Sequence, residues 1–269
     1  MATRTTDHTG FARQFDWLTL SLLLGVLLLC YYVVPMVSLF ASVPPTAIAS
    51  SLGDSTVVNA AATSLVSATL STLIAAAFGL PLAYWLARAD TPWKSIALAL
   101  VVLPLVLPPT VGGVVLLTVF GPNTFIGGLA SAAGLPLTRS LAGTVLAQTF
   151  VASPFVVVTA KAAFEGVDKT LEYASQSLGK SRATTLRKVT LPLAGPGILA
   201  GVTLAFARAM GEFGATMMMA YYPRTLPVQI WVSFISLGLD NAYPVAIILV
   251  CISVLVLAVL NTIGSNPWT

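Results

Sequence analysis

The octapeptide ASQSLGKS at residues 174–181 fits the loose pattern of a phosphate-binding loop, Ala or Gly, four residues, then Gly-Lys-Ser. Such a loop binds nucleotide phosphates through its backbone N–H groups and its lysine. It needs a buried strand before it, a flexible glycine-rich turn and a helix after it. A helix-like run precedes this octapeptide, and its first residue is Ala174 instead of glycine. We therefore expect no nucleotide site here.

Arg208 and Glu212 form a second candidate, because they are ionisable residues inside an apolar run, RAMGEFGAT. Four residues apart, they share one face of a helix. An ionisable residue within a membrane segment is by default functional, but an oppositely charged pair is also how a helix bundle neutralises buried charge. Structural pairing and a role in a transport path both remain open.

Metal and redox chemistry have little support in the sequence. Cys30 and Cys251 lie in separate apolar runs without a neighbouring histidine or cysteine, which predicts core residues and not ligands. The single histidine, His8, lies in a polar N-terminal segment. A membrane enzyme would need clustered His, Asp or Cys near an interface, so this class is disfavoured.

The composition is that of an integral membrane protein: 57% of the 269 residues are hydrophobic and 8% are charged, against about 25% charged in a soluble domain. Long apolar runs without alternation predict membrane-spanning helices. We expect one bundle over residues 17–264, with polar tails at 1–16 and 265–269. Its six spans are expected at 17–40, 59–87, 94–120, 143–164, 196–221 and 243–264.

The positions of Lys and Arg predict the orientation. With the N-terminus inside, ten of them lie in inner segments, whereas the outer loops hold only Arg139 and Arg224. This asymmetry follows the positive-inside rule and predicts cytoplasmic N- and C-termini. It also accounts for the net charge of +4 without nucleic acid. The apolar stretch 226–239 is too short for a regular crossing, which favours an interfacial or re-entrant helix on the outer side.

The inner segment 165–195 has the signals of two short helices. Asp168 is suited to cap the first, and Gly179 is suited to the left-handed position that ends it. Ser181 is suited to cap the second, which Pro192 is expected to end. The first helix carries an apolar face of Leu171, Ala174 and Leu178.

Cations in the same segment keep the apolar faces of the two short helices out of the bilayer. Lys180, Arg182, Arg187 and Lys188 all lie in this segment. A cytoplasmic protein partner would cover the faces. The alternative is a solvated loop lying on anionic lipid headgroups, and composition does not separate the two.

Two spans carry residues that interrupt a helix or allow another helix to pack closely against it. The third span contains Pro104, Pro108, Pro109, Gly112 and Gly113 near mid-membrane. Irregular backbone at that depth must face protein or a water-lined cavity, although a proline kink that only shapes packing is the alternative. The fifth span has a ridge of small residues suited to close packing within the bundle or against a second copy, namely Gly197, Gly201, Ala205 and Ala209.

The inner segment resembles the cytoplasmic loop of ATP-binding-cassette importer permeases, whose pattern is Glu-Ala-Ala, three residues, Gly, nine residues, Ile, any residue, Leu-Pro. Gly179 is followed after nine residues by Val-Thr-Leu-Pro at 189–192. The Glu-Ala-Ala position falls on Tyr-Ala-Ser at 173–175, with Glu172 one residue early. In such permeases this loop is a coupling helix that sits in a cleft of a separate ATPase subunit.

The resemblance implies that ATP and magnesium are bound by the partner ATPase, with no cofactor, metal or catalytic residue in this chain. It assigns ATPase coupling to Leu171, Glu172, Tyr173, Ala174, Leu178, Gly179, Leu186, Val189, Leu191 and Pro192.

Three further stretches, LPLVLPPTVGG in the third span, RAMGEFGAT in the fifth and RTLP at 224–227, together resemble the molybdate, tungstate and sulfate permeases, most closely the molybdate branch. The resemblance implies a type I importer permease: an all-α bundle of six spans with a cytoplasmic coupling loop, in the cell membrane. Implied partners are a second copy, ATPase subunits, an extracytoplasmic oxyanion-binding protein and membrane lipid. Residues implied near the path or gate are Pro108, Thr110, Gly112, Glu212 and Thr216.

The expected function is therefore ATP-driven uptake of a tetrahedral oxyanion by alternating access. Molybdate or tungstate is the first expectation, and sulfate or thiosulfate the alternative. A stand-alone ion-gradient transporter is a different class that would need several intramembrane acids or a repeated broken-helix design. The sequence has one intramembrane pair and no internal repeat.

Overall fold

The computed structural model of the protein describes residues 9–264. Every regular element in that range is helical, which confirms the all-α prediction. Of the two expected tails, 1–8 and 265–269 lie outside the described residues, whereas 9–16 belong to the first helix. The long helices are α1 (Thr9–Ala41), α3 (Ser55–Arg88), α7 (Leu141–Glu165), α10 (Leu191–Met210) and α13 (Leu239–Gly264).

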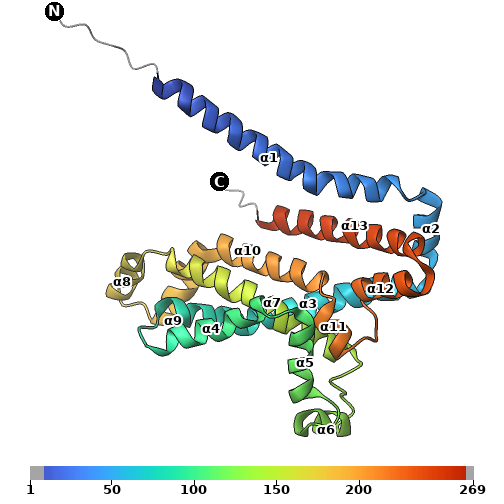
Figure 1. Cartoon of the computed structure of the whole chain (residues 1–269). Coiled ribbons are helices and arrows are strands. Elements are labelled where there is room, and N and C mark those ends of the chain that lie inside the picture. The colour runs from blue at the N-terminus through green and yellow to red at the C-terminus, as the bar shows by residue number, and fades with distance from the viewer. Residues whose placement is uncertain (1–8, 265–269) are drawn as a thin grey trace, which may run out of the picture.

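Helices α3, α7 and α10 pack together at the centre of the bundle, with α13 beside α10 (Figure 1). Their contact faces are lined by small side chains, and Ala68, Ala152 and Ala205 are fully buried. Within the described range five helices are long and apolar enough to cross a membrane, and a sixth span results if α4 and α5 are taken as one. The six-span bundle is thus consistent with the helices observed.

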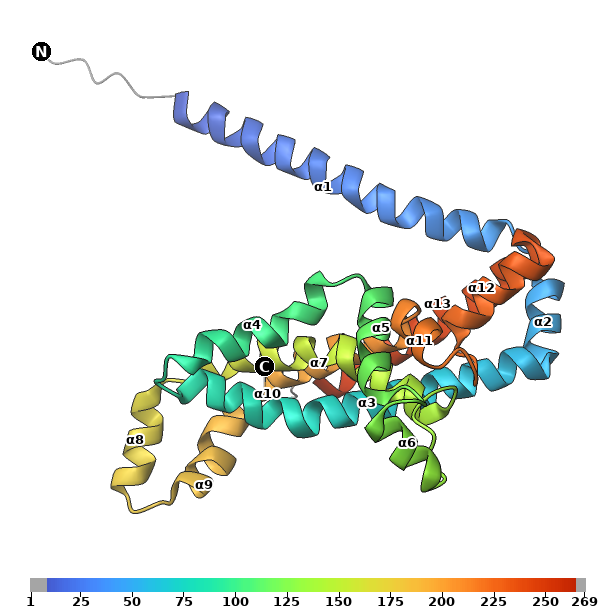
Figure 2. The same cartoon turned by 60° about the horizontal axis from the view of Figure 1, so that its bottom comes forward.

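The third expected span is sharply broken. Helix α4 (Trp93–Val106) and helix α5 (Pro109–Phe120) meet at an angle of 118°. Pro108 has an extended backbone and Pro109 begins α5, so two successive residues lack the N–H that would continue the hydrogen-bond ladder. Helix α5 turns out of the direction of α4 and leads to α6 (Phe125–Ala132), as Figure 2 shows.

The helix that contains most of the fifth expected span begins before residue 196 and ends at Met210. Helix α9 (Arg182–Thr185), a π-helical segment (Leu186–Thr190) and α10 form one continuous helix, Arg182–Met210. The prediction that Pro192 ends the cytoplasmic helix is therefore wrong. The Leu191 N–H donates to the Leu186 carbonyl five residues back, and this widened turn lets the helix continue into Pro192. Three residues, 211–213, separate Met210 from the short helix α11 (Gly214–Met219).

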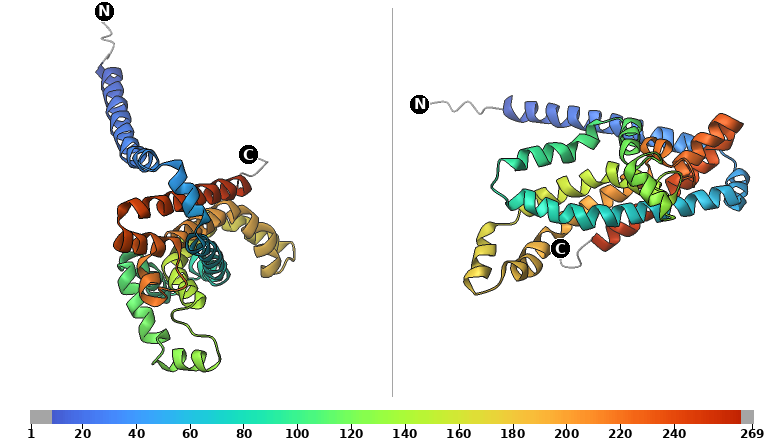
Figure 3. Two further views of the ribbon diagram at one scale, coloured as in Figure 1. Left: turned by 90° about the vertical axis from the view of Figure 1, so that its right-hand side faces the viewer. Right: turned by 90° about the horizontal axis from the view of Figure 1, so that it is seen from below.

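Helix α1 stands apart from the bundle (Figure 3), and no residue in its most apolar window is buried. It is joined to α3 through α2 (Pro45–Gly53). Helix α12 (Leu226–Leu237) occupies the stretch expected to be interfacial or re-entrant, and it packs against α13. Cys30 and Cys251 are both exposed, so their prediction as core residues is wrong. Cys251 lines an apolar hollow between α13 and the Met36 and Phe40 side chains of α1.

Candidate functional site

The inner segment forms a helical hairpin of α8 (Lys169–Ser177) and α9, which projects from one end of the bundle (Figure 2). The predicted local signals are confirmed. Asp168 Oδ1 accepts a hydrogen bond of 2.8 Å from the Thr170 N–H, and Ser181 Oγ accepts one of 3.2 Å from the Thr184 N–H. Gly179 has a φ of +77° and makes the turn between the helices.

Hydrogen bonds at the start of α8 lower the pKa of Asp168. The first cause is the side-chain hydrogen bond from Thr170, and the second is the backbone hydrogen bond from the same residue. A carboxylate at a helix N-terminus is the favourable charge for the helix dipole. The cap therefore remains ionised at neutral pH.

The phosphate-loop-like octapeptide 174–181 consists of the last turn of α8, the Gly179 turn and the cap of α9. A helix and not a strand precedes it, so the context that a phosphate loop requires is not present at this position. The local structure agrees with the expectation that these residues do not hold a nucleotide.

Large apolar side chains on the hairpin point away from the bundle. Leu171, Tyr173 and Leu178 are 47%, 63% and 81% exposed. Cations are interspersed along the same hairpin, which excludes burial of these side chains in hydrocarbon. An exposed apolar surface rimmed by charge is typical of a protein docking site.

The other residues assigned to coupling divide into two groups. Ala174, Gly179 and Pro192 are exposed, like Leu171, Tyr173 and Leu178. Leu186, Val189 and Leu191 are half-buried, and Leu191 packs on a core cluster that contains Phe164. Leu191 therefore belongs to the packing of the bundle and not to the exposed face of the hairpin.

Glu172 lies on the inner side of α8 and is buried. Its Oε1 is 2.7 Å from Arg88 Nη2, and Arg88 Nε lies 3.2 Å from both carboxylate oxygens. Thr190 Oγ1 donates a further hydrogen bond of 2.8 Å to Oε1. In the sequence, Arg88 is one of the ten inner cations that indicate the orientation. Its contact with Glu172 could not be predicted there, because 84 positions separate the two residues.

The two interrupted spans meet at their breaks. A Cβ added to Gly214, the first residue of α11, would lie 3.0 Å from both the Pro109 Cβ and the Thr110 N. One added to Gly113 would lie 2.7 Å from the Met218 Cβ and 2.9 Å from the Ala215 carbonyl oxygen. Glycine at both positions therefore permits α5 and α11 to pack backbone to backbone.

Arg208 and Glu212 form an ion pair across the end of α10. Arg208 Nη2 lies 2.5 Å from Glu212 Oε2, and the Glu212 side chain is 1% exposed. The other carboxylate oxygen, Oε1, accepts a hydrogen bond of 2.8 Å from the Ala215 N–H. The pair thus compensates the buried charge and also satisfies a backbone group at the start of α11.

The remaining residues predicted near the path lie around this junction. Pro108 and Thr110 are exposed, whereas Gly112 is buried against the Phe150 ring. Thr216 is fully buried, and its hydroxyl has no hydrogen-bond partner among the described residues. One chain therefore leaves the junction open on the side of Pro108 and Thr110.

The small-residue ridge of α10 is occupied within the chain. A Cβ at Gly197 would lie 2.6 Å from the Ala163 Cβ, and one at Gly201 would lie 3.0 Å from the Thr159 Cβ. Ala205 and Ala209, further along the ridge, are fully buried. The ridge packs on α7 and serves the bundle.

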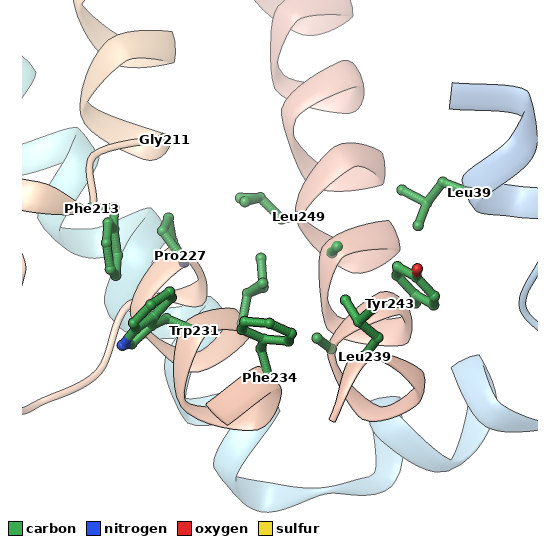
Figure 4. A pocket seen from close by; sticks show the side chains of 12 residues that line it. Leu39, Gly211, Phe213, Pro227, Trp231, Phe234, Leu239, Tyr243 and Leu249 are labelled. Carbon is green, nitrogen blue, oxygen red and sulfur yellow. The ribbon is translucent and has the colours of Figure 1, made fainter. Parts of the chain in front are cut away.

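An apolar groove of about 490 Å³ lies between α12, α13 and the break after α10 (Figure 4). Phe213, Trp231 and Phe234 line it, with Leu39 of α1 at its edge. Hydrocarbon walls offer neither cations nor enough hydrogen-bond donors to replace the water around a doubly charged anion. This groove does not have the chemistry of an oxyanion site.

Comparison with known families gives one match over most of the chain. Residues 79–265 match the family described as binding-protein-dependent transport system inner membrane component. The matched range includes the hairpin, the Arg88–Glu172 pair and both interrupted spans.

Named relatives match over 217 to 252 residues. A probable molybdenum ABC transporter permease of Haloferax volcanii is 57% identical over 252 residues, which cover 94% of this chain and 92% of that protein. The molybdate/tungstate transport system permease WtpB of Thermococcus kodakarensis is 36% identical over 240 residues, covering 88% and 92%. A probable sulfate transport system permease of Anthoceros angustus is 33% identical over 217 residues, covering 80% and 75%.

A solved structure shares the fold. A chain of a bacterial alginate ABC transporter, solved in complex with a periplasmic protein bound to an alginate pentasaccharide, aligns with a TM-score of 0.73 at 16% identity. The alignment covers 97% of this chain and 98% of that one. The helical arrangement, with its projecting hairpin and interrupted spans, is that of an ABC importer permease.

Proposed function

This chain belongs to the family of binding-protein-dependent transport system inner membrane components, and on that premise we propose that it imports molybdate or tungstate as the membrane subunit of an ATP-driven transporter. The observation that carries the proposal is the 57% identity, along nearly the full length of both chains, to a permease named for molybdenum. The second relative is named for molybdate and tungstate. Sulfate is the alternative, with support from a relative of lower identity.

The proposed ATPase partner docks on the outer face of the α8–α9 hairpin. Support comes from Leu171, Tyr173 and Leu178, which nothing in the described chain covers. Tyr173 stands where the family pattern has glutamate, so we propose that it contacts the ATPase by apolar packing. ATP and magnesium are bound in that partner.

The proposed pathway lies beside the junction of α5 and α11 and is completed by a second copy of the chain. Support comes from the exposure of Pro108 and Thr110 in a single chain. An extracytoplasmic binding protein delivers the anion, so dense cationic coordination in the permease is not required. Alternating access would change how tightly α5 and α11 pack.

The proposed orientation places the hairpin and both ends of the chain in the cytoplasm. The excess of Lys and Arg in the inner segments supports it. The described start of α1 and end of α13 also lie toward the end of the bundle that carries α8 (Figure 1).

Reconstitution tests the transport proposal. Proteoliposomes should contain this chain and its ATPase, with the binding protein outside and ATP inside, and accumulated molybdate should be measured by elemental analysis. Uptake is expected to require all three proteins and ATP. Uptake by this chain alone would instead identify a stand-alone transporter, and equal competition by excess sulfate and tungstate would contradict the assigned substrate.

Cross-linking tests the docking surface. In a chain with Cys30 and Cys251 replaced by serine, Leu178→Cys is expected to cross-link to the ATPase, because this side chain is 81% exposed. Leu135→Cys, 67% exposed on the predicted outer side, is the matched control and is expected to give no cross-link. The reverse result would place the ATPase on the other face.

A further inference from the structure

Three side chains from separate parts of the chain meet at the inner end of the bundle. Arg88 is the last residue of α3, Glu172 lies in α8, and Thr190 ends the π-helical segment that leads into α10. The Arg88 and Glu172 side chains are 13% and 9% exposed, and Thr190 is fully buried. The cluster is thus shielded from solvent.

Several hydrogen bonds hold this cluster together. Glu172 accepts from Arg88 Nε and Nη2 and from the Thr190 hydroxyl. Arg88 Nη2 also lies 3.3 Å from the Val167 carbonyl oxygen, just before the cap of α8. Two buried charges with this many partners fix distance and direction more strictly than apolar contacts, because a small displacement loses hydrogen bonds that water cannot replace.

Glu172 and the docking surface lie on opposite sides of α8. Leu171 and Tyr173, its neighbours in sequence, are exposed, whereas Glu172 faces α3 and α10. Ser175 and Thr185 join α8 to α9 through a hydroxyl contact of 3.0 Å, which stiffens the hairpin. Glu172 is therefore a direct contact through which a force on the outer face of α8 reaches α3, beside the route through α9, which continues into α10.

We propose that Arg88, Glu172 and Thr190 are positioning residues that transmit displacement of α8 to α3 and α10, and so link ATP hydrolysis in the partner to movement of the membrane helices. This inference rests on the proposed function. The Arg88 contact carries the movement to α3, and the Thr190 contact carries it to α10. At its far end α10 reaches the Arg208–Glu212 pair and the junction with α5.

The test compares anion uptake with ATP hydrolysis in the reconstituted complex. The double variant Arg88→Met, Glu172→Leu replaces both charges by apolar side chains of similar size, a change that buried ion pairs often tolerate without loss of stability. We expect this variant to copurify with the ATPase and to hydrolyse ATP. The amount of molybdate accumulated per ATP hydrolysed is expected to fall at least about fivefold. Fivefold is the lower end of the range by which one coupled site typically changes another.

Two further variants serve as a partial disruption of the cluster and as a control. Thr190→Val keeps the side-chain shape and removes the hydrogen bond to Glu172, so a smaller fall in the same ratio is expected. Glu165→Gln removes an exposed carboxylate that pairs with Lys161 and Lys94 at the same end of the bundle, and it is expected to leave the ratio unchanged.

The outcomes separate transmission from assembly. An unchanged ratio in the double variant, or equal falls in uptake and hydrolysis, would overturn the inference. Loss of the ATPase from the purified double variant would show that the cluster serves docking, and this result would also overturn the inference. The wild-type complex tests the proposed function independently, because its failure to accumulate molybdate would be seen before any variant is compared.

Discussion

Gly214 faces Pro109 across a junction so narrow that a Cβ on Gly214 would lie 3.0 Å from the Pro109 Cβ. These residues begin α11 and α5, the segments that follow the breaks in two membrane spans. Two helix starts are thus held face to face inside the bundle.

The tightest approach at this junction predicts a severe effect of Gly113→Ala. The added methyl group would meet Ala215 and Met218, and overpacking of this kind destabilises by about 1–3 kcal/mol. Thermal unfolding of the solubilised protein, followed by tryptophan fluorescence, should shift to lower temperature, and uptake should fall. Gly195→Ala is the control, since nothing lies within 4 Å of a Cβ there. Equal effects at both positions would contradict the close packing.

The geometry of the Arg208–Glu212 pair predicts that substitution of Arg208 destabilises the protein more than substitution of Glu212. Arg208→Met leaves a carboxylate that is 1% exposed without its cation, a defect that costs about 3–5 kcal/mol. Glu212→Gln is expected to cost less, because Arg208 is 28% exposed and the glutamine oxygen can still accept from the Ala215 N–H. Thermal unfolding of the two variants compares them. A larger loss for Glu212→Gln would contradict the geometry.

The turn at Gly179 predicts a graded effect of substitution. No atom lies within 4 Å of a Cβ at this position, so the cost of Gly179→Ala comes from the φ of +77° alone, about 1–2 kcal/mol. Asparagine tolerates this conformation better, so Gly179→Asn should retain more ATP-dependent uptake than Gly179→Ala. Gly179→Arg adds bulk beside the docking surface and is expected to abolish uptake while membrane insertion is preserved. Unchanged uptake in Gly179→Arg would remove the hairpin from the mechanism.

The cap of α8 predicts a limited pH dependence. Because hydrogen bonds from Thr170 lower the pKa of Asp168, its stabilising effect is fully present above the ordinary carboxyl pKa of about 3.9. It is lost only as pH falls through the lower, folded-state value. Hydrogen exchange in α8, corrected for intrinsic rates, should show constant protection between about pH 5 and pH 8. Asp168→Ala should reduce that protection and Asp168→Asn should largely keep it.

Local features of this fold could be predicted from the sequence with good accuracy. The caps at Asp168 and Ser181 and the left-handed turn at Gly179 depend on a few neighbouring residues, so their residue types were sufficient evidence. The interruption of the third span followed from its prolines, although its 118° angle did not. Helix interruption depends on the missing N–H, whereas the angle depends on packing with α11.

Contacts between distant parts of the chain could not be predicted from the sequence, for physical reasons. The contact between Arg88 and Glu172 joins residues 84 positions apart, and no local pattern encodes it. Cys30 and Cys251 were expected in the core but are exposed, because lipid and protein interior favour the same apolar residues. Helix continuation through Pro192 depended on a widened turn that residue types alone do not predict.

The π-helical segment Leu186–Thr190 holds one more residue per turn than the helices on either side of it. Because that extra residue is contained within one turn, deleting a single residue there would restore regular winding and leave the phase between the helices on either side nearly unchanged. A deletion in a regular turn of α10 would instead rotate one part of the helix relative to the other by about 100° and shorten it by about 1.5 Å. The widened turn therefore absorbs one residue of chain length between the hairpin and the membrane helices, and it should tolerate a one-residue deletion better than the regular turns of α10 do.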